Sequence, residues 1–358
     1  MTNNVAQHRE SLTWNEIQSQ GAVWRALIGE LGQSADVDKM LASSRRAESW
    51  LFVGCGTSFY LAEAAATSWS ILSGQETRAL PASEVLLYPA LSGGQNRDVQ
   101  AVVISRSGHT SEAVRAASAL KRELHFPTFG LTCAEQSALE AECDCTLVLP
   151  ATDDKSTVMT RSFTSMLISL QYLAARSSGN AEFIQSLQEM ANRAEPLIRL
   201  LSSQVESFVA SRAFADYVFL GQGPFYGIAR EAALKVMEMS CSYSQAFHSL
   251  EFRHGPKAIV SPQTCLTFYL SETAQQAETE LLQEMKELGG VTIAVCNRAS
   301  KEVRDASDLV IEVNASSNEL ALLAPYSVPA QLIGFFTGIG KGLNPDHPKN
   351  LTRVVILD

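Results

Sequence analysis

The feature that most constrains the fold is a repeat, because one strand, turn and helix pattern occurs twice. Residues 51–65 and 218–232 each contain an apolar strand, a G-x-G turn and a helix rich in small residues. Gly54 in the first copy corresponds to Gly221 in the second. Near-continuous apolar strands are typical of parallel sheets covered by helices on both faces. The sequence therefore predicts an α/β protein with two copies of one doubly wound unit.

Later strands of the two copies support this interpretation. Residues 127–133 and 290–296 are paired in the same way, and the offset between their final cysteines is nearly the same as that between the two glycines. Each is followed by a polar stretch and another apolar strand, residues 145–149 or 309–313. Both copies are thus expected to form a mostly parallel sheet.

Two further segments have helical rather than strand patterns. Residues 160–204 are rich in Leu, Met, Ala, Ser and Glu at helical spacing, which predicts helices between the two sheets. Near the start of the chain, an amphipathic pattern predicts a helix with Ile17, Trp24 and Leu27 facing the protein body.

Composition excludes several classes of partner. The chain has 358 residues and a formal net charge of -10, without basic clusters, which argues against nucleic acids and anionic membranes. Its start lacks the basic and apolar regions of a signal peptide, and no run of about 18 apolar residues occurs. These features predict a soluble, cytoplasmic protein.

Cysteines and histidines give no sign of a metal site. The seven cysteines lack C-x-x-C spacing, and the six histidines are scattered. We interpret the cysteines as reduced core residues and expect neither a metal nor a cofactor.

The segment 102–114, VVISRSGHTSEAV, begins as a buried strand and continues into hydroxyls, a glycine and a helix. In an open parallel sheet, ligands bind where such loops leave the carboxyl ends of strands. Ser105, Ser107 and Thr110, with Gly108 allowing close backbone approach, suit a single phosphate at a helix N-terminus. The alternative is ordinary helix capping, which needs only one hydroxyl.

The G-x-G turn at Gly54 also raises the possibility of a dinucleotide fold. However, Phe59 replaces the third glycine of G-x-G-x-x-G, and no strand ends in Asp or Glu about 20 residues later. We therefore expect no dinucleotide here. Instead, the Ser58 hydroxyl should point into the crevice at the carboxyl ends of the strands, where the loop with Ser105 also lies.

Five motifs occur in the order GCGTS, SRSGHT, AALKVME, EFRHGP and PKNLTRVV. Together they resemble the isomerase half of glucosamine-6-phosphate synthase, a tandem of SIS (sugar isomerase) domains. The short entry WNEIQSQ and the segment VMTRSFT are most similar to the stand-alone branch, which includes tagatose-6-phosphate ketose/aldose isomerase-like proteins and amino-sugar-6-phosphate deaminases. The resemblance covers nearly the whole chain from about residue 13.

This resemblance implies two tandem doubly wound SIS domains, each a mostly parallel sheet with helices on both faces. We place the boundaries as follows: an N-terminal helical arm at 1–37, the first SIS domain at 38–205, the second at 206–342, and a C-terminal tail closing the active site at 343–358.

For the substrate, the resemblance implies a sugar phosphate. Ser105, Ser107 and Thr110 would hold the phosphate, with Arg106 where the synthase has Gln, and Ser58 would line the sugar.

For the chemistry, the resemblance implies that Glu238 moves a proton between C1 and C2. His254 would assist ring opening from the other subunit of a homodimer with shared active sites. A carboxylate and a second proton-transferring group are what an enediol or enolamine route needs. The alternative for Glu231, Lys235 and Glu238 is an ordinary set of charges on one helix face.

Two departures of this sequence from the pattern of the synthase limit which reactions it can carry out. Nothing resembles a glutaminase domain, since Thr2 follows Met1 and the first cysteine is Cys55. Arg353 stands where the synthase has an imine-forming lysine, and a guanidinium is a poor nucleophile. Arg353 is a candidate substrate ligand, or alternatively a salt bridge that ties down the tail. We interpret residues 153–155 as a solvated loop, with the sugar end of the site as the alternative.

Several functions therefore stay open. We favour isomerisation and deamination of glucosamine- or galactosamine-6-phosphate to a ketose 6-phosphate and ammonia. A plain aldose-ketose phosphate isomerase and a fructosamine-6-phosphate deglycase use the same proton transfer. A non-catalytic sugar-phosphate sensor is the alternative of another class, although the segment before the first SIS motif is too short and too acidic for a DNA-binding domain.

Overall fold

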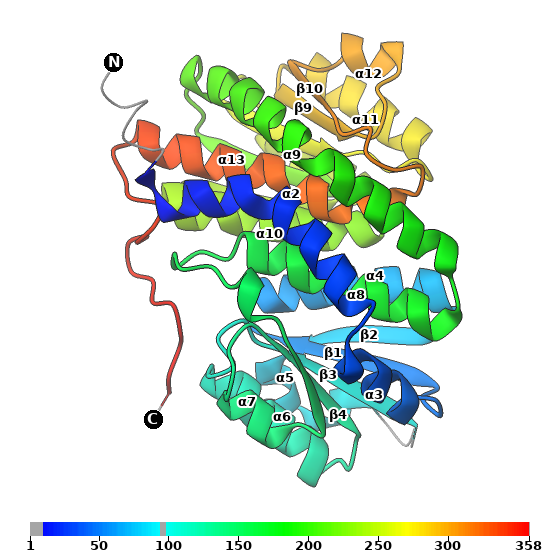
Figure 1. Cartoon of the computed structure of the whole chain (residues 1–358). Coiled ribbons are helices and arrows are strands. Elements are labelled where there is room, and N and C mark those ends of the chain that lie inside the picture. The colour runs from blue at the N-terminus through cyan, green and yellow to red at the C-terminus, as the bar shows by residue number, and fades with distance from the viewer. Residues whose placement is uncertain (1–9, 94–97, 358) are drawn as a thin grey trace. The chain divides into compact units, whose positions relative to one another are not determined.

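The computed structural model describes residues 10–93 and 98–357 (Figure 1). The chain divides into two compact units, which are described separately. The first-repeat unit comprises Val23–Asp154, Arg161–Gln188 and Thr352–Asp358. The second-repeat unit comprises Met1–Ala22, Lys155–Thr160 and Glu189–Leu351.

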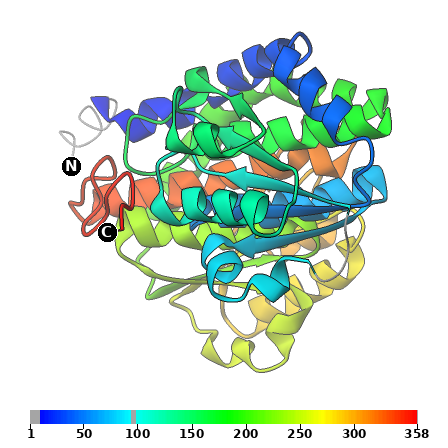
Figure 2. The same cartoon turned by 90° about the horizontal axis from the view of Figure 1, so that it is seen from below.

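The first-repeat unit is built on a five-stranded sheet in the order β2-β1-β3-β4-β5, with every neighbouring pair parallel (Figure 2). The strands are β1 (Ser49–Gly54), β2 (Glu76–Pro81), β3 (Val99–Ile104), β4 (Thr128–Thr132) and β5 (Cys145–Val148). The helices are α3 (Ala35–Ser43), α4 (Thr57–Ser73), α5 (Ala82–Leu87), α6 (Ser111–Arg122), α7 (Ala138–Glu142) and α8 (Arg161–Ser178), with the 3-10 turns η2 (Pro89–Ser92) and η3 (Pro150–Thr152).

Alternating side chains of β1 bury both faces of this sheet. Leu51 and Val53 pack in one apolar cluster with residues of α5, α6 and α7. Trp50 and Phe52 point to the other face, where both contact Trp69 of α4, at ring-centroid distances of 4.2 and 5.5 Å. Figure 1 shows α5, α6 and α7 on one side of the sheet, with α4 and α8 on the other.

The second-repeat unit has an equivalent parallel sheet in the order β10-β9-β8-β6-β7. Its strands are β6 (Asp216–Gly221), β7 (Tyr243–His248), β8 (Thr264–Tyr269), β9 (Val291–Cys296) and β10 (Leu309–Glu312). Its helices are α10 (Pro224–Ser240), α11 (Gln275–Glu287), α12 (Lys301–Asp305) and α13 (Leu323–Gly340), with the 3-10 turns η4 (Leu250–Arg253), η5 (Pro256–Ile259) and η6 (Glu319–Leu322).

The two sheets share strand order and register. Gly54 pairs with Pro81 in the first, and Gly221 pairs with His248 in the second, so the repeated glycine has the equivalent partner in each sheet. The predicted α/β class with two parallel repeats is confirmed. The residue boundaries predicted for the domains stay predictions.

Helix α13 is the most apolar element of the second-repeat unit. Among the described residues, Glu319–Gly340 is the one helical segment long and apolar enough to cross a membrane, yet its most apolar 18-residue stretch is completely buried inside the protein. It packs closely on α10, because a Cβ on Gly334 would lie 2.8 Å from the Lys235 carbonyl oxygen, and one on Gly338 would lie 2.3 Å from that of Met239. Its apolar character therefore reflects a core position.

The other predicted helices are also present. The segment expected to be helical forms α8 and α9 (Ala181–Ala210). The N-terminal pattern forms α2 (Leu12–Leu31), and the three apolar residues expected to face inward are at most 2% exposed. The interpretation of every cysteine as a core residue is wrong for Cys241, which is exposed where α10 ends in a left-handed conformation.

The N-terminus of α2 is capped by a residue far away in sequence. Asp346 accepts hydrogen bonds from the amides of Leu12 (3.0 Å) and Thr13 (2.8 Å) and from the Ser11 hydroxyl (2.6 Å). Ser11 in turn accepts from the amide of Trp14. The carboxylate also supplies the negative charge that the first turn of α2 lacks.

We expect Asp346→Asn to lower the free energy of unfolding by about 1 kcal/mol at neutral pH. Burial by itself raises the pKa of Asp346, but hydrogen bonds from Ser11, Thr13 and Leu12 outweigh burial and hold it below its ordinary 3.8. Stability from a lowered pKa is present above the unfolded-state value and is lost as pH falls through the folded one. Denaturant unfolding at pH 7 and near pH 3 should therefore show the variant's deficit shrinking in acid. The exposed control Asp305→Asn should match the wild type at both values, and an equal deficit for Asp346→Asn at both would contradict the cap.

Candidate functional site

The strand order of the first sheet reverses between β1 and β3. These two strands lie side by side, with Val53 paired to Val103, while their crossovers leave in opposite directions along the sheet. The loops that follow β1 and β3 therefore leave the same sheet edge next to each other. In open α/β sheets this reversal is where ligands bind.

The loop after β3 holds the predicted phosphate residues in a compact turn. Ser105 is buried, and its amide donates to the carbonyl of Leu131 at 3.0 Å. Gly108 has φ +64°, and a Cβ there would lie 2.4 Å from the Cβ of Ser137, so both conformation and space require glycine. Ser107 Oγ lies 3.4 Å from Thr110 Oγ1 and accepts a hydrogen bond from the amide of His109.

The capping alternative for these hydroxyls is wrong. Thr110 is the N-cap residue of α6, but its side chain makes no capping hydrogen bond. The amides of Ser107 and Thr110 donate to no other group in the part of the chain that the structure describes. The start of α6 thus combines hydroxyls and backbone donors at the positive end of a helix dipole, which is an arrangement suited to an anion.

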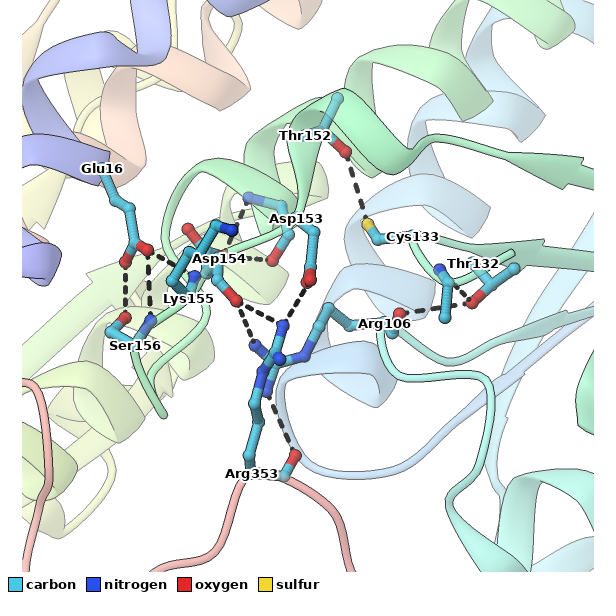
Figure 3. Close-up of polar contacts among 12 residues, drawn as sticks. Glu16, Arg106, Thr132, Cys133, Thr152, Asp153, Asp154, Lys155, Ser156 and Arg353 are labelled. Carbon is cyan, nitrogen blue, oxygen red and sulfur yellow. Dashed lines mark hydrogen bonds and ion pairs between the residues drawn. The ribbon is translucent and has the colours of Figure 1, made fainter. Parts of the chain in front are cut away.

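The Arg106 side chain points toward Asp154 and Arg353 of the C-terminal tail (Figure 3). Arg106 is 5% exposed, and its guanidinium donates to the carbonyl oxygens of Asp154 (3.4 Å) and Arg353 (3.1 Å). Arg353 forms an ion pair with Asp153 and donates to the Asp154 carbonyl at 2.5 Å. Burial lowers the pKa of Arg106, and Asp154 partly opposes that shift, so the group stays cationic at neutral pH. The salt bridge considered for Arg353 is therefore present.

Asp154 corrects the interpretation of residues 153–155 as a solvated loop. Its side chain is fully buried and accepts hydrogen bonds from the amides of Arg161 (3.2 Å) and Ser162 (3.1 Å) at the start of α8. In the second-repeat unit, Glu16 accepts from the amides of Lys155 and Ser156 (Figure 3). A buried carboxylate therefore fixes the backbone on each side of the junction between residues 154 and 155: that of Asp154 before it and that of Glu16 after it.

The end of the chain is bonded to the start of α6. The amide of Ser111 donates to the carbonyl of Val355 at 3.2 Å, and the Ser111 hydroxyl accepts from the amide of Leu357 at 2.9 Å. Arg115 donates to the carbonyl of Leu357 at 3.2 Å. Within the first-repeat unit, the tail therefore lies beside the hydroxyl-rich loop.

Ser58 lies in the first turn of α4, directly after the G-x-G turn. It is 5% exposed, and its backbone lies so close to β1 that a Cβ on Gly54 would be 2.4 Å from the Ser58 carbonyl oxygen. The turn at Gly54 therefore brings the start of α4 against the end of β1, at the same edge as the loop after β3.

In the second-repeat unit, Glu238 belongs to a charged triad on α10. Lys235 is 1% exposed; it pairs with Glu238 and lies 3.3 Å from Glu231, which is equally buried. Burial by itself lowers the pKa of Lys235, but the two carboxylates outweigh burial and raise it. The expected charged helix face is therefore real, and its buried lysine is a residue that sequence reasoning did not assign to the site. The signal in the sequence was the placement of Glu231 four residues before Lys235 and of Glu238 three residues after it, which puts all three on one helix face.

His248 and His254 of the second-repeat unit lie in different surroundings. His254 is exposed immediately after η4, and its amide donates to the carbonyl of Glu251 at 3.0 Å. His248 is stacked on Tyr226 at a centroid distance of 3.7 Å, and burial lowers its pKa. Of these two residues, His254 is the more exposed.

The structure thus gathers one part of the predicted set in the first-repeat unit: Ser58, Ser105, Arg106, Ser107, Thr110 and Arg353. Glu238 and His254 belong to the second-repeat unit. In the described ranges 10–93 and 98–357, no group of three or more His, Cys, Asp or Glu side chains could hold a metal ion.

Comparisons with curated proteins and solved structures identify related enzymes. The D-galactosamine-6-phosphate deaminase AgaS of Escherichia coli is 25% identical over 96% of this chain and 94% of its own length. An isomerizing glutamine–fructose-6-phosphate aminotransferase of Pyrobaculum aerophilum is 27% identical over 99% of this chain, which spans 61% of that longer protein.

Among solved structures, a glucosamine-6-phosphate deaminase of Thermotoga maritima is 29% identical, with a TM-score of 0.81 over 97% of this chain and 100% of its own. Tagatose-6-phosphate ketose/aldose isomerase of Escherichia coli, at 23% identity and a TM-score of 0.83, shares the fold. The SIS domain model matches residues 44–176 and 216–335, one segment for each sheet. The chain therefore belongs to the SIS domain family, which includes phosphosugar isomerases, and it carries two SIS segments.

Proposed function

We propose that this protein isomerises and deaminates an amino-sugar 6-phosphate. Glucosamine- or galactosamine-6-phosphate and water would give a ketose 6-phosphate and ammonia. The observation that carries the proposal is similarity along the full length of two stand-alone deaminases, one 29% and one 25% identical. The aminotransferases, by contrast, are considerably longer than this chain.

In this proposal, the loop after β3 binds the phosphate. The hydroxyls of Ser105, Ser107 and Thr110 and the amides at the start of α6 donate to its oxygens, and the helix dipole adds a favourable potential. The buried charge of Arg106 strengthens that potential, while its hydrogen bonds attach the loop to the tail. Ser58 lines the sugar side.

Glu238 would carry out the proton transfer, with Lys235 fixing the orientation of its carboxylate. After ring opening assisted by His254, the carboxylate removes the proton from C2 while O1 takes up a proton, which gives an enolamine. The carboxylate returns its proton to C1 as the nitrogen loses one, which leaves a C2 imine. Water adds to C2, the nitrogen takes the proton that the new hydroxyl gives up, and the C–N bond breaks to release ammonia and leave the ketone. No further reactant is needed.

Arg353 would stabilise the closed tail, and we include it among the substrate-binding groups by its position. Its guanidinium is paired with Asp153 and stays protonated, so it forms no imine with the ketose. The nitrogen is therefore released as ammonia and is not held on this side chain.

We expect Glu238→Gln to lower kcat for ammonia release by about 10²- to 10⁴-fold, because a positioned base is lost. The measurement is ammonia release from glucosamine- and galactosamine-6-phosphate, coupled to detection of the ketose. Glu280→Gln, an exposed glutamate on α11, is the control and should keep wild-type activity. Full activity in Glu238→Gln would remove Glu238 from the mechanism. If neither sugar turns over with the wild type while fructose-6-phosphate raises its Tm, a plain isomerase, a deglycase or a sensor becomes the better proposal.

We expect Ser107→Ala to weaken binding of the sugar phosphate about tenfold or more, because a hydrogen bond to a charged oxygen is lost. Isothermal calorimetry with the Glu238→Gln protein as background would measure the affinity without turnover. The exposed Ser177→Ala change on α8 serves as the comparison and should leave affinity unaltered. Equal affinities in both variants would place the phosphate elsewhere.

We further propose a homodimer in which His254 acts on the substrate of the other subunit. His254→Ala and Glu238→Gln should each be inactive, but reassembling an equal mixture should restore about a quarter of wild-type activity, since half of the dimers are hybrid and each hybrid has one intact site. Light scattering gives the oligomeric state. An active monomer, or a mixture without recovery, would overturn the shared site.

A further inference from the structure

The second repeat contains a counterpart of the proposed phosphate loop. It is the segment from Leu270 to Ala274, between β8 and α11, and we call it the second loop. Strand β8 lies beside β6 where the strand order reverses, as β3 lies beside β1. The amide of Leu270 donates to the carbonyl of Val295 at 2.9 Å, as Ser105 donates to Leu131 in the first repeat.

A buried carboxylate fills the second loop. Glu278, in the first turns of α11, is completely inaccessible to solvent. Its Oε2 accepts hydrogen bonds from the amide (2.8 Å) and the hydroxyl (2.9 Å) of Ser271, and its Oε1 accepts from the Ser249 hydroxyl at 2.8 Å. These donors are of the same kinds that the first loop presents at the start of α6.

A second carboxylate accepts hydrogen bonds from the remaining donors of the second loop. Glu319, in η6, accepts from the amides of Glu272 (2.7 Å) and Thr273 (3.3 Å) and from the Thr273 hydroxyl. Three consecutive backbone amides, from Ser271 to Thr273, therefore donate to two side-chain carboxylates. Ser107 and Thr110 in the first loop have no carboxylate partner within the residues that the structure describes.

The difference between the repeats lies partly in one helix position. Counted from the first residue of each helix, the fourth position is Val114 in α6 and Glu278 in α11. Val114 has no hydrogen-bonding side chain, so it leaves the donors of the first loop open. Glu278 returns its carboxylate to the loop that precedes its own helix.

Burying Glu278 has an electrostatic cost that its hydrogen bonds offset. Desolvation raises the pKa of Glu278, the three donated hydrogen bonds oppose that shift, and the charge of Glu319 adds to it. A phosphate entering this loop would have to displace two carboxylates and meet their repulsion. Occupation by the protein's own groups therefore excludes an external anion.

We propose that Glu278, together with Glu319, is a built-in anion that closes the second loop, so that each chain binds one phosphate monoester. The inference rests on the proposed phosphate site in the first loop. It assigns Glu278 a specificity role, because the duplicated fold would otherwise offer two equivalent loops.

Two measurements test the proposal. Calorimetry with glucosamine-6-phosphate on the Glu238→Gln protein should give one site per chain, and two sites would overturn the proposal without any change at Glu278. Next, Glu278→Ala is combined with Ser107→Ala, which weakens phosphate binding at the first loop so that binding at the second loop can be detected. Inorganic phosphate should then raise the Tm by about 3 °C or more at saturation, against sodium chloride of equal ionic strength.

The matched control is Glu280→Ala with Ser107→Ala, which removes an exposed glutamate from the same helix and should show only the smaller rise due to the weakened first loop. Acetate, which resembles the missing carboxylate, is titrated in parallel. Stabilisation by acetate alone would show a carboxylate cradle that does not accept phosphate, and this would overturn the proposal. The absence of stabilisation by either anion would do so as well. If Glu278→Ala does not fold, the site count of the Glu238→Gln protein decides the question.

Failure of the proposed function gives a different result. In that case Ser107→Ala leaves sugar-phosphate affinity unchanged, whereas the comparison between Glu278→Ala and Glu280→Ala still reports whether the second loop can take an anion.

Discussion

Backbone amides at the start of a helix need acceptors, and this requirement shapes both sheet edges of the molecule. Each parallel sheet ends its central strand in a loop that leads into a helix, so amide and hydroxyl donors collect at the same place twice. In the second repeat, Glu278 and Glu319 provide the acceptors. In the first repeat, the amides of Ser107 and Thr110 donate to no group among the described residues. Loops at equivalent positions in the two sheets thus differ in whether carboxylates of the protein already accept hydrogen bonds from them.

The same principle governs charge elsewhere in the protein. Lys235 is almost completely buried, and two carboxylates on its own helix compensate for its desolvation. Arg106 is buried beside Asp154 and the tail, where carbonyl oxygens accept its protons. Asp346 and Asp154 satisfy the first turns of α2 and α8. Buried charges of this kind are costly to leave unpaired, so they favour a single arrangement of the segments that they join.

The fold was predictable because its signals are local and repeated. Short apolar strands, glycine turns and helical spacing each mark one element, and their duplication marks two sheets. The hydroxyl-rich loop was also predictable, since three hydroxyls and a glycine follow a buried strand. Several contacts were not. The direction of the Arg106 side chain, the burial of Asp154 and the exposure of Cys241 depend on neighbours that are distant in sequence. Lys235 was visible as part of a charged helix face, but its burial depends on the close approach of α13 at Gly334.

The α/β class, the two repeats, the hydroxyl loop at the end of a strand and the resemblance to the SIS family could all be inferred from the amino-acid sequence alone. These properties follow from residue type and spacing along a short stretch of chain. Only the tertiary structure decided which donors and charges already have partners within the protein. Glu278 closes its loop, Asp346 caps α2 and Arg353 pairs with the sequence-distant Asp153, because hydrogen bonds and ion pairs depend on distances in space.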